Sequence, residues 1–139
     1  MEIKRNKRNI FQRILGIPAT GRPTDPAAWR MEGGRLVVNL DHAPELARPG
    51  GALRIEGHGC PERVLVLHGE DGTFRAWRNR CGHKGRRLDP VAGTETIQCC
   101  SINEATYTFG CEKLKGPGDK PVVPFTVAIE GRLLQIAVG

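Results

Sequence analysis

The stretch "NRCGHKGRRLDP", residues 79–90, holds a cysteine and a histidine one residue apart, Cys81 and His83. A second stretch, "IQCCSINEATYTF" at residues 97–109, offers two adjacent cysteines and no histidine. Each stretch follows a run of strand-forming residues and enters a loop, so we expect two loops with soft ligands at one end of a small β-structure. This arrangement favours an iron–sulfur cluster or a zinc ion. Unrelated structural cysteines are the alternative, because buried thiols are common in protein cores.

The rest of the chain predicts an all-β protein. Its 18 glycines and 10 prolines divide it into short segments. The segments rich in strand-forming residues are 35–40, 52–57, 63–69, 74–80, 94–98, 105–109, 124–130 and 132–138. Asp71-Gly72 and Gly131 mark hairpin turns. Only residues 7–16 have a clear helical period, and residues 41–51 allow at most one helical turn. We therefore expect a small antiparallel β-sandwich or barrel.

Length and cysteine content limit the protein class. A chain of 139 residues can bury a core without needing a metal for that purpose. No apolar run approaches the ~18 residues of a membrane span, and the first residues lack the features of a secretory signal. We therefore predict a cytoplasmic protein without a membrane span. Its five cysteines are an odd number, which favours reduced or metal-bound thiols over a disulfide framework.

The net charge of +6 is concentrated at the N-terminus. Residues 1–13 hold five cations against the single acid Glu2. A solvated basic tail is the simplest interpretation, although such a tail can also contact an anionic partner. Aromatic residues make up 5% of the chain and do not alternate with the basic ones. We therefore predict no nucleic-acid binding.

The two cysteine stretches resemble the ligand pattern of Rieske iron–sulfur domains, Cys-x-His followed by Cys-x-x-His. Cys81-Gly-His83 is followed by sixteen residues and then by Cys100, with Asn103 three positions later. The choice of Cys100 over the preceding cysteine rests on register, because it places Tyr107 where the family has an aromatic residue. In addition, "KGPGDKP" at residues 115–121 resembles the proline-containing loop that covers the cluster in this family.

The resemblance extends over residues 35–139, and residues 1–34 are interpreted as a basic N-terminal extension. It implies a Rieske-type fold, an antiparallel β-sandwich or barrel with a two-loop cluster-binding subdomain. It also implies a [2Fe-2S] cluster in which Cys81 and Cys100 hold one iron and His83 contributes to the other.

Asn103 stands where the family has its second histidine. Four completions of the site remain open: the Asn103 carbonyl oxygen, a thiolate from Cys99 or Cys111, a solvent or partner ligand, or no cluster at all. Because asparagine is a weak ligand for iron, thiolate or solvent completion ranks above it. A single iron or a zinc ion held by the same loops, with Cys99 as a further ligand, is the alternative cofactor.

The resemblance implies single-electron transfer, by a soluble ferredoxin-type protein or by an electron-transfer subunit of an oxidoreductase. Nothing in the chain resembles a mononuclear-iron catalytic domain, so we expect a redox carrier rather than a stand-alone enzyme. A cluster-free accessory subunit of a reductase is the rival interpretation, because of Asn103. In the family, the residue matching Tyr107 donates a hydrogen bond to a cluster sulfur, whereas Ala105 stands at the position of a second such donor. We therefore expect a potential below that of the respiratory members.

A basic run surrounds the first cysteine stretch. Between Arg75 and Arg87 the chain has no acidic residue. Its cations are Arg75, Arg78, Arg80, Lys84, Arg86 and Arg87. A solvated basic edge is one interpretation. The other is a docking surface for an acidic redox partner, because charge of one sign steers an oppositely charged protein to the site.

Overall fold

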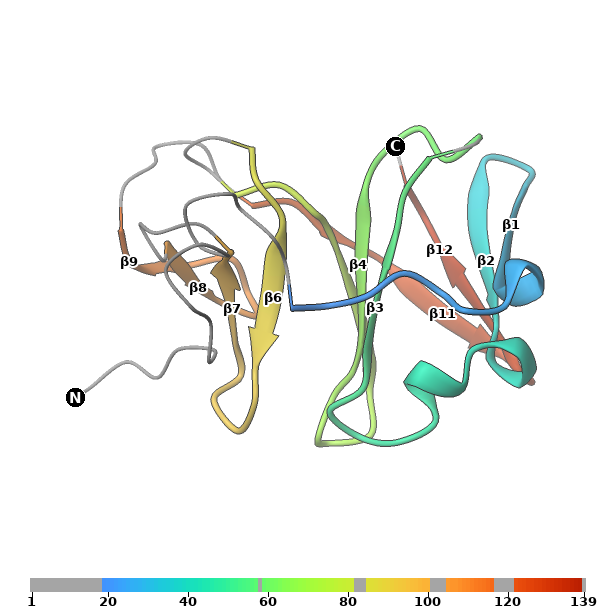
Figure 1. The fold of residues 1–139 in the computed structure, drawn as a ribbon, viewed down its shortest axis with the longest axis horizontal. Coiled ribbons are helices and arrows are strands. Elements are labelled where there is room, and N and C mark those ends of the chain that lie inside the picture. Colours follow the sequence, from blue (N-terminus) through green and yellow to red (C-terminus); the bar gives the residue numbers. More distant parts are fainter. Residues whose placement is uncertain (1–18, 58, 82–84, 101–104, 117–121, 139) are drawn as a thin grey trace. The chain divides into compact units, whose positions relative to one another are not determined.

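The computed structural model describes residues 19–57, 59–81, 85–100, 105–116 and 122–138 (Figure 1). The described residues form three antiparallel sheets of four strands each. The chain divides into two compact units. Residues 21–78 and 124–139 make up the first, named here the sandwich unit, and residues 1–20 and 79–123 make up the second, named the cysteine unit.

The sandwich unit contains two of the sheets. The first has the strand order β1 (Trp29–Glu32), β2 (Arg35–Asn39), β12 (Leu133–Ile136), β11 (Val127–Glu130). The second has the order β10 (Pro124–Phe125), β5 (Phe74–Arg78), β4 (Val64–His68), β3 (Ala52–Ile55). The described connections include the short 3-10 helices η1 (Pro26–Ala28), η2 (Leu40–His42) and η3 (Pro44–Leu46).

One apolar core joins these two sheets. Leu36 and Val38 of β2 are fully buried and lie on the same face of the strand, because successive residues of a strand point to opposite faces. They belong to one packed cluster with Leu53 of β3, Val66 of β4 and Leu134 of β12. Residues on the inner faces of both sheets therefore fill a common interior, as in a β-sandwich.

The cysteine unit contains the third sheet, with the order β6 (Leu88–Val91), β7 (Thr96–Cys99), β8 (Thr106–Thr108), β9 (Lys113–Lys115). All neighbouring strands are antiparallel, and Leu88 of β6 lies opposite Cys99 of β7. On the other side of β7, Ile97 lies opposite Tyr107 of β8. The sheet thus connects the end of the first cysteine stretch to the second.

The structure confirms the predicted all-β fold, a small antiparallel sandwich with a separate unit that carries the cysteine loops. The hairpins at Asp71-Gly72 and Gly131 are present between β4 and β5 and between β11 and β12. The segment 41–51 forms parts of two 3-10 turns rather than one, and β5 ends at Arg78 instead of residue 80. The predicted helix at 7–16 lies outside the described residues.

Three strands were not predicted from the sequence: β1, β6 and β9. Of these, β1 pairs with β2, so residues 29–32 belong to the first sheet of the sandwich unit. The division of the chain at residue 34 stays a prediction.

Candidate metal centre

The backbones of Cys81 and Cys100 meet at one dipeptide. The N–H of Cys81 donates to the carbonyl oxygen of Arg86 at 2.7 Å, and the N–H of Cys100 donates to the carbonyl oxygen of Arg87 at 3.0 Å. Cys81 is 5% exposed and Cys100 2% exposed. Because Arg86 and Arg87 are consecutive, the structure brings together the two residues predicted to bind the first iron.

Cys99 is the last residue of β7 and is buried. Its N–H donates to the carbonyl oxygen of Ala105 at 2.7 Å, which closes the second cysteine loop. Strand alternation places the Cys99 side chain on the same face of the sheet as Ile97. Tyr107 lies opposite Ile97 and is buried on that face as well. Cys99 and Tyr107 therefore share a face of the sheet beside the loop.

Cys111 lies in the turn between β8 and β9. Its N–H donates to the carbonyl oxygen of Thr108 at 2.8 Å, and its φ is 70°. Thr108 pairs with Thr96, the first residue of β7, so this turn lies at the end of the sheet opposite Cys99. Burial raises the pKa of the Cys111 thiol. A raised pKa disfavours the thiolate, which is the form that binds metals.

Cys60 belongs to the sandwich unit. Its thiol donates to the carbonyl oxygen of Glu62 at 3.0 Å, and burial raises its pKa. None of the five cysteines forms a disulfide. Both observations agree with the prediction of reduced thiols, and they identify Cys60 as a packed thiol.

His83 and Asn103 lie outside the described residues, as does Lys84. Within the described part of the chain, no group of three or more His, Cys, Asp or Glu side chains could hold a metal ion. The ligand assignments at both loops therefore stay predictions, with the Cys81–Cys100 approach as their structural basis.

Asn79 is a functional candidate that the sequence analysis missed. It lies two residues before Cys81 and is 0% exposed. Its Oδ1 accepts a hydrogen bond from the N–H of Leu88 at 2.6 Å, which ties the start of the first loop to β6. Its Nδ2 is buried without a hydrogen-bond partner in the described structure. An unsatisfied buried donor costs about 1–3 kcal/mol, so this atom calls for an explanation.

Asp89 was also missed, and it anchors the N-terminal segment to the cysteine unit. Its buried carboxylate accepts hydrogen bonds from the N–H groups of Ala19 and Thr20, both at 2.8 Å. A buried carboxylate needs such donors to offset the loss of hydration. No sequence motif marks this contact, because its partners lie about 70 residues earlier in the chain.

Gly116 brings the start of the 115–121 segment against the second cysteine loop. Its φ is 92°, and a Cβ at this position would lie 2.6 Å from the Cα of Ala105. Only glycine permits both the positive φ and the close approach. The remainder of the predicted covering loop, residues 117–121, lies outside the described residues.

The predicted basic run divides between the two units. In the sandwich unit, Arg75 pairs with Asp71 and Arg78 pairs with Glu62, each at 3.4 Å. In the cysteine unit, the Arg80 guanidinium lies against Gly85, where a Cβ would be 2.7 Å from it. Arg86 and Arg87 are half-buried in the segment that joins the two cysteine loops.

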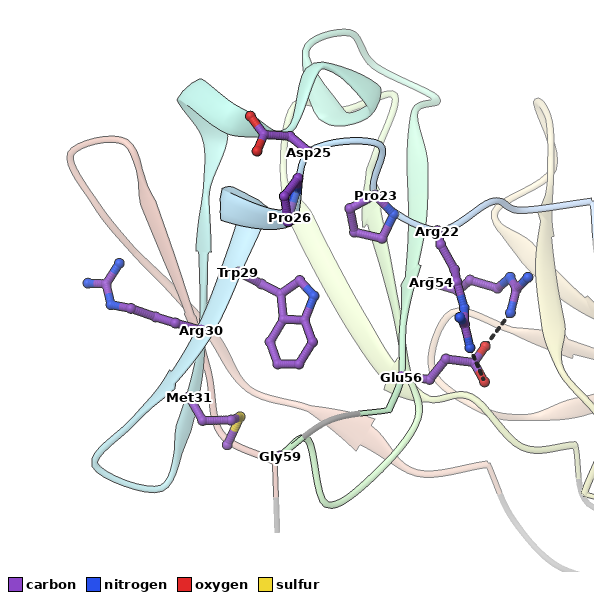
Figure 2. A pocket seen from close by; sticks show the side chains of 10 residues that line it. All are labelled: Arg22, Pro23, Asp25, Pro26, Trp29, Arg30, Met31, Arg54, Glu56 and Gly59. Atoms are coloured by element: carbon purple, nitrogen blue, oxygen red, sulfur yellow. Dashed lines mark hydrogen bonds and ion pairs between the residues drawn. The ribbon is translucent and has the colours of Figure 1, made fainter.

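A pocket of about 500 Å³ lies in the sandwich unit (Figure 2). Trp29 and Met31 of β1 form part of its apolar wall. The mostly buried carboxylate of Glu56 is paired with the guanidinium of Arg54 and, at 3.8 Å, with that of Arg22. Figure 2 shows these pairs at the side of the pocket away from Met31. With one carboxylate against two guanidinium groups, these three residues leave a net positive charge on this wall.

Solved structures similar to this chain include a ferredoxin and Rieske proteins. The ferredoxin of carbazole 1,9a-dioxygenase from Nocardioides aromaticivorans IC177 matches with 22% identity and a TM-score of 0.59, over 74% of this chain and 95% of that one. The plasma membrane Rieske protein PetC3 from Synechocystis PCC 6803 matches with 20% identity and a TM-score of 0.52, over 63% and 87%. The quaternary ammonium Rieske monooxygenase CntA matches with 23% identity and a TM-score of 0.51, over 67% of this chain and 29% of its own.

No curated protein sequence matches this chain. Among its described residues, none forms a helix that is long and apolar enough to cross a membrane. The model of one family, the Rieske [2Fe-2S] domain, matches residues 36–126, which include both cysteine stretches. With its fold, its paired cysteine loops and this match over more than half of its length, the chain belongs to the Rieske [2Fe-2S] domain family.

Proposed function

We propose that this protein transfers single electrons through a [2Fe-2S] cluster, as a soluble ferredoxin-type protein or as an electron-transfer subunit of an oxidoreductase. The observation that carries the proposal is the approach of two buried cysteines, Cys81 and Cys100, on either side of the Arg86-Arg87 dipeptide. The solved relatives include the ferredoxin of a dioxygenase and a monooxygenase, which supports a role in an oxygenase system.

The donor set fits a cluster of this type. Cys81 and Cys100 would hold one iron as thiolates, and His83 would bind the other as a neutral imidazole. When bound, the cluster supplies a one-electron couple. The chain's own contribution is to fix the two thiolates through the backbone hydrogen bonds to Arg86 and Arg87 and to keep water away from them.

Solvent, or the Cys99 thiolate after a loop rearrangement, is the favoured fourth ligand in this proposal. The candidate Cys111 has a raised pKa and follows Thr108 at the other end of β7 and β8. The candidate Cys99 belongs to the face of Ile97, which also carries Tyr107. Either thiolate would need its loop to rearrange before it could complete the site.

Iron and acid-labile sulfide analysis of anaerobically purified protein tests the proposal. We expect two irons and two sulfides per chain and a reddish-brown colour. If the analysis finds zinc, or a single iron without sulfide, the protein has a mononuclear metal site instead of a cluster. Protein that stays colourless and metal-free after reconstitution with iron and sulfide would establish the cluster-free accessory subunit instead.

Substitution of the residue that departs from the family pattern tests the ligand set. Asn103→His should restore two imidazoles on one iron, with a low average g value after reduction and a potential in the Rieske range of about −150 to +300 mV. Asn39→His is the matched control, because Asn39 caps η2 in the sandwich unit. Spectra unchanged from wild type in Asn103→His would show that residue 103 does not reach the cluster.

The redox partner is proposed to present an acidic face to Arg80, Arg86 and Arg87 of the cysteine unit. Because surface charges are screened beyond about 10 Å at 0.1 M salt, the electron-transfer rate should fall as ionic strength rises. Arg86→Glu should slow the rate and leave the visible spectrum intact. Arg75→Glu, in the sandwich unit and outside the proposed docking surface, is the comparison variant and should slow it less. A rate that does not vary with salt would remove the docking role.

A further inference from the structure

The side-chain amide of Asn79 makes a hydrogen bond through its oxygen atom, and its nitrogen atom has no hydrogen-bond acceptor among the described residues. Oδ1 accepts from the N–H of Leu88 at 2.6 Å, and a backbone N–H requires an acceptor, so this contact fixes which end of the amide is oxygen. Nδ2 is therefore directed elsewhere. It is buried, and the described residues give it no hydrogen-bond acceptor.

The position of Asn79 places it beside the predicted iron ligands. Asn79 and Cys81 are both buried, whereas Arg80 between them is exposed. Leu88, the partner of Oδ1, directly follows Arg87, whose carbonyl oxygen accepts from Cys100. Asn79 is thus held at the junction of the two cysteine loops.

We propose that the Nδ2–H of Asn79 donates a hydrogen bond to a sulfur atom of the cluster site, which makes Asn79 a positioning residue that raises the reduction potential. This inference rests on the proposed function. Thiolate and sulfide sulfurs carry negative charge and accept hydrogen bonds, and reduction increases that charge. A fixed donor at this position stabilises the reduced state more than the oxidised one. It also supplies the missing acceptor for a buried donor.

Two substitutions separate this role from the structural contact with Leu88. Asn79→Asp keeps an oxygen for the Leu88 N–H and removes the donor, whereas Asn79→Leu removes both without adding charge. Both variants should keep two irons and show a lower midpoint potential than wild type. Gln98→Met is the matched control: it removes another buried amide of the cysteine unit, whose Nε2 already donates to Thr106. Its potential should stay at the wild-type value.

Hyperfine spectroscopy of the reduced cluster detects the proposed hydrogen bond directly. A purely structural role of Asn79 would produce no such signal. In protein labelled with 15N only in asparagine, we expect a 15N coupling that is absent from Asn79→Asp or from Asn79→Gln, which keeps an amide but carries no label. If neither variant binds iron, the coupling is measured in labelled Asn103→His protein, where it cannot arise from residue 103, and its presence or absence there decides.

The outcomes also separate this inference from the proposed function. A wild-type protein with two irons, no such coupling and a potential unaffected by Asn79→Asp overturns the inference alone, and an ordered water at Nδ2 then explains the buried donor. A wild-type protein without iron and sulfide overturns the proposed function and this inference together.

Discussion

The two units of the molecule differ in what fills their interiors. The packed core of the sandwich unit contains only apolar side chains, such as Leu36, Leu53 and Leu134. Every buried polar residue of the described chain belongs to the cysteine unit: Thr20, Asn79, Asp89, Thr96, Gln98 and Thr106. The same unit holds the buried cysteines at positions 81, 99 and 100. The interior of the cysteine unit thus combines apolar side chains with buried polar groups and thiols, whereas that of the sandwich unit is mainly apolar.

This difference assigns different roles to the two interiors. Apolar burial is proportional to the area removed from water and tolerates small shifts of the side chains. A buried polar group is favourable only when its partner is in place, so a polar interior demands one precise arrangement. Metal binding adds its free energy to the folding of the unit that holds the ligands. We therefore expect the cysteine unit to depend on its cofactor and the sandwich unit to be independent of it.

The largest effect should come from the two thiolate ligands. Cys81→Ser or Cys100→Ser should abolish iron binding and the visible bands. Amide hydrogen exchange should then accelerate in residues 79–116 and stay slow in β3 and β4 of the sandwich unit. Cys111→Ser, in the turn at the other end of the sheet, should keep both irons. Full iron content in either of the first two variants would contradict the ligand assignment.

A cavity in the apolar core of the sandwich unit should lower the stability of the protein and leave its iron content unchanged. Leu134 is fully buried between the sheets of the sandwich unit, and Leu134→Ala should cost about 2–5 kcal/mol of unfolding free energy. Denaturant titration measures this loss. The iron content and the spectrum of the folded variant should match those of wild type, and loss of iron below the unfolding transition would show that the two interiors are coupled.

The buried carboxylate of Asp89 should have an intermediate effect. Asp89→Asn replaces one acceptor of the Ala19 and Thr20 N–H groups by a donor and should cost about 1–3 kcal/mol. Exchange of the Ala19 and Thr20 amides should accelerate more than that of any other residue. Asp71→Asn, at the exposed turn before β5, should change stability by less than about 0.5 kcal/mol. Equal effects of the two changes would mean that burial of Asp89 adds nothing.

The smallest effect should come from the hydroxyl of Tyr107. The family resemblance assigns it a hydrogen bond to sulfur, and the loss of one such bond is worth about 1 kcal/mol. Tyr107→Phe should therefore lower the potential by tens of millivolts, at about 59 mV per tenfold change for one electron, with the visible spectrum unchanged. Voltammetry measures the shift, and an unaltered potential would show that the hydroxyl does not contact the cluster.

The sequence was enough to predict those strands that consist of several apolar, strand-forming residues, such as residues 35–40 and 63–69. It did not reveal β9, whose three residues are all exposed. It also missed β1, where Trp29 and Met31 alternate with Arg30 and Glu32 over only four residues. Pro90 concealed β6, since proline is unfavourable inside a sheet. In the structure β6 is an edge strand of its sheet, where a missing N–H is tolerated.

At the candidate site, the spacing of Cys81 and Cys100 was enough to predict that their loops meet. The roles of Asn79 and Asp89 could not be predicted, because they depend on which buried atoms find a partner. The Asn79 contact joins residues nine positions apart, and the Asp89 contacts join residues about 70 positions apart. Neither separation corresponds to a periodic element, so only the three-dimensional structure reveals them.

The edge strands of the cysteine unit have a further consequence, for the behaviour of the protein at high concentration. An unprotected sheet edge recruits strands from other molecules and starts aggregation. Here β6 carries Pro90, which offers no N–H to an incoming strand, and β9 carries the exposed Lys113 and Lys115, which repel a second copy of the same edge. Molecules without the proposed cluster should therefore remain dispersed long enough to be reconstituted with iron and sulfide.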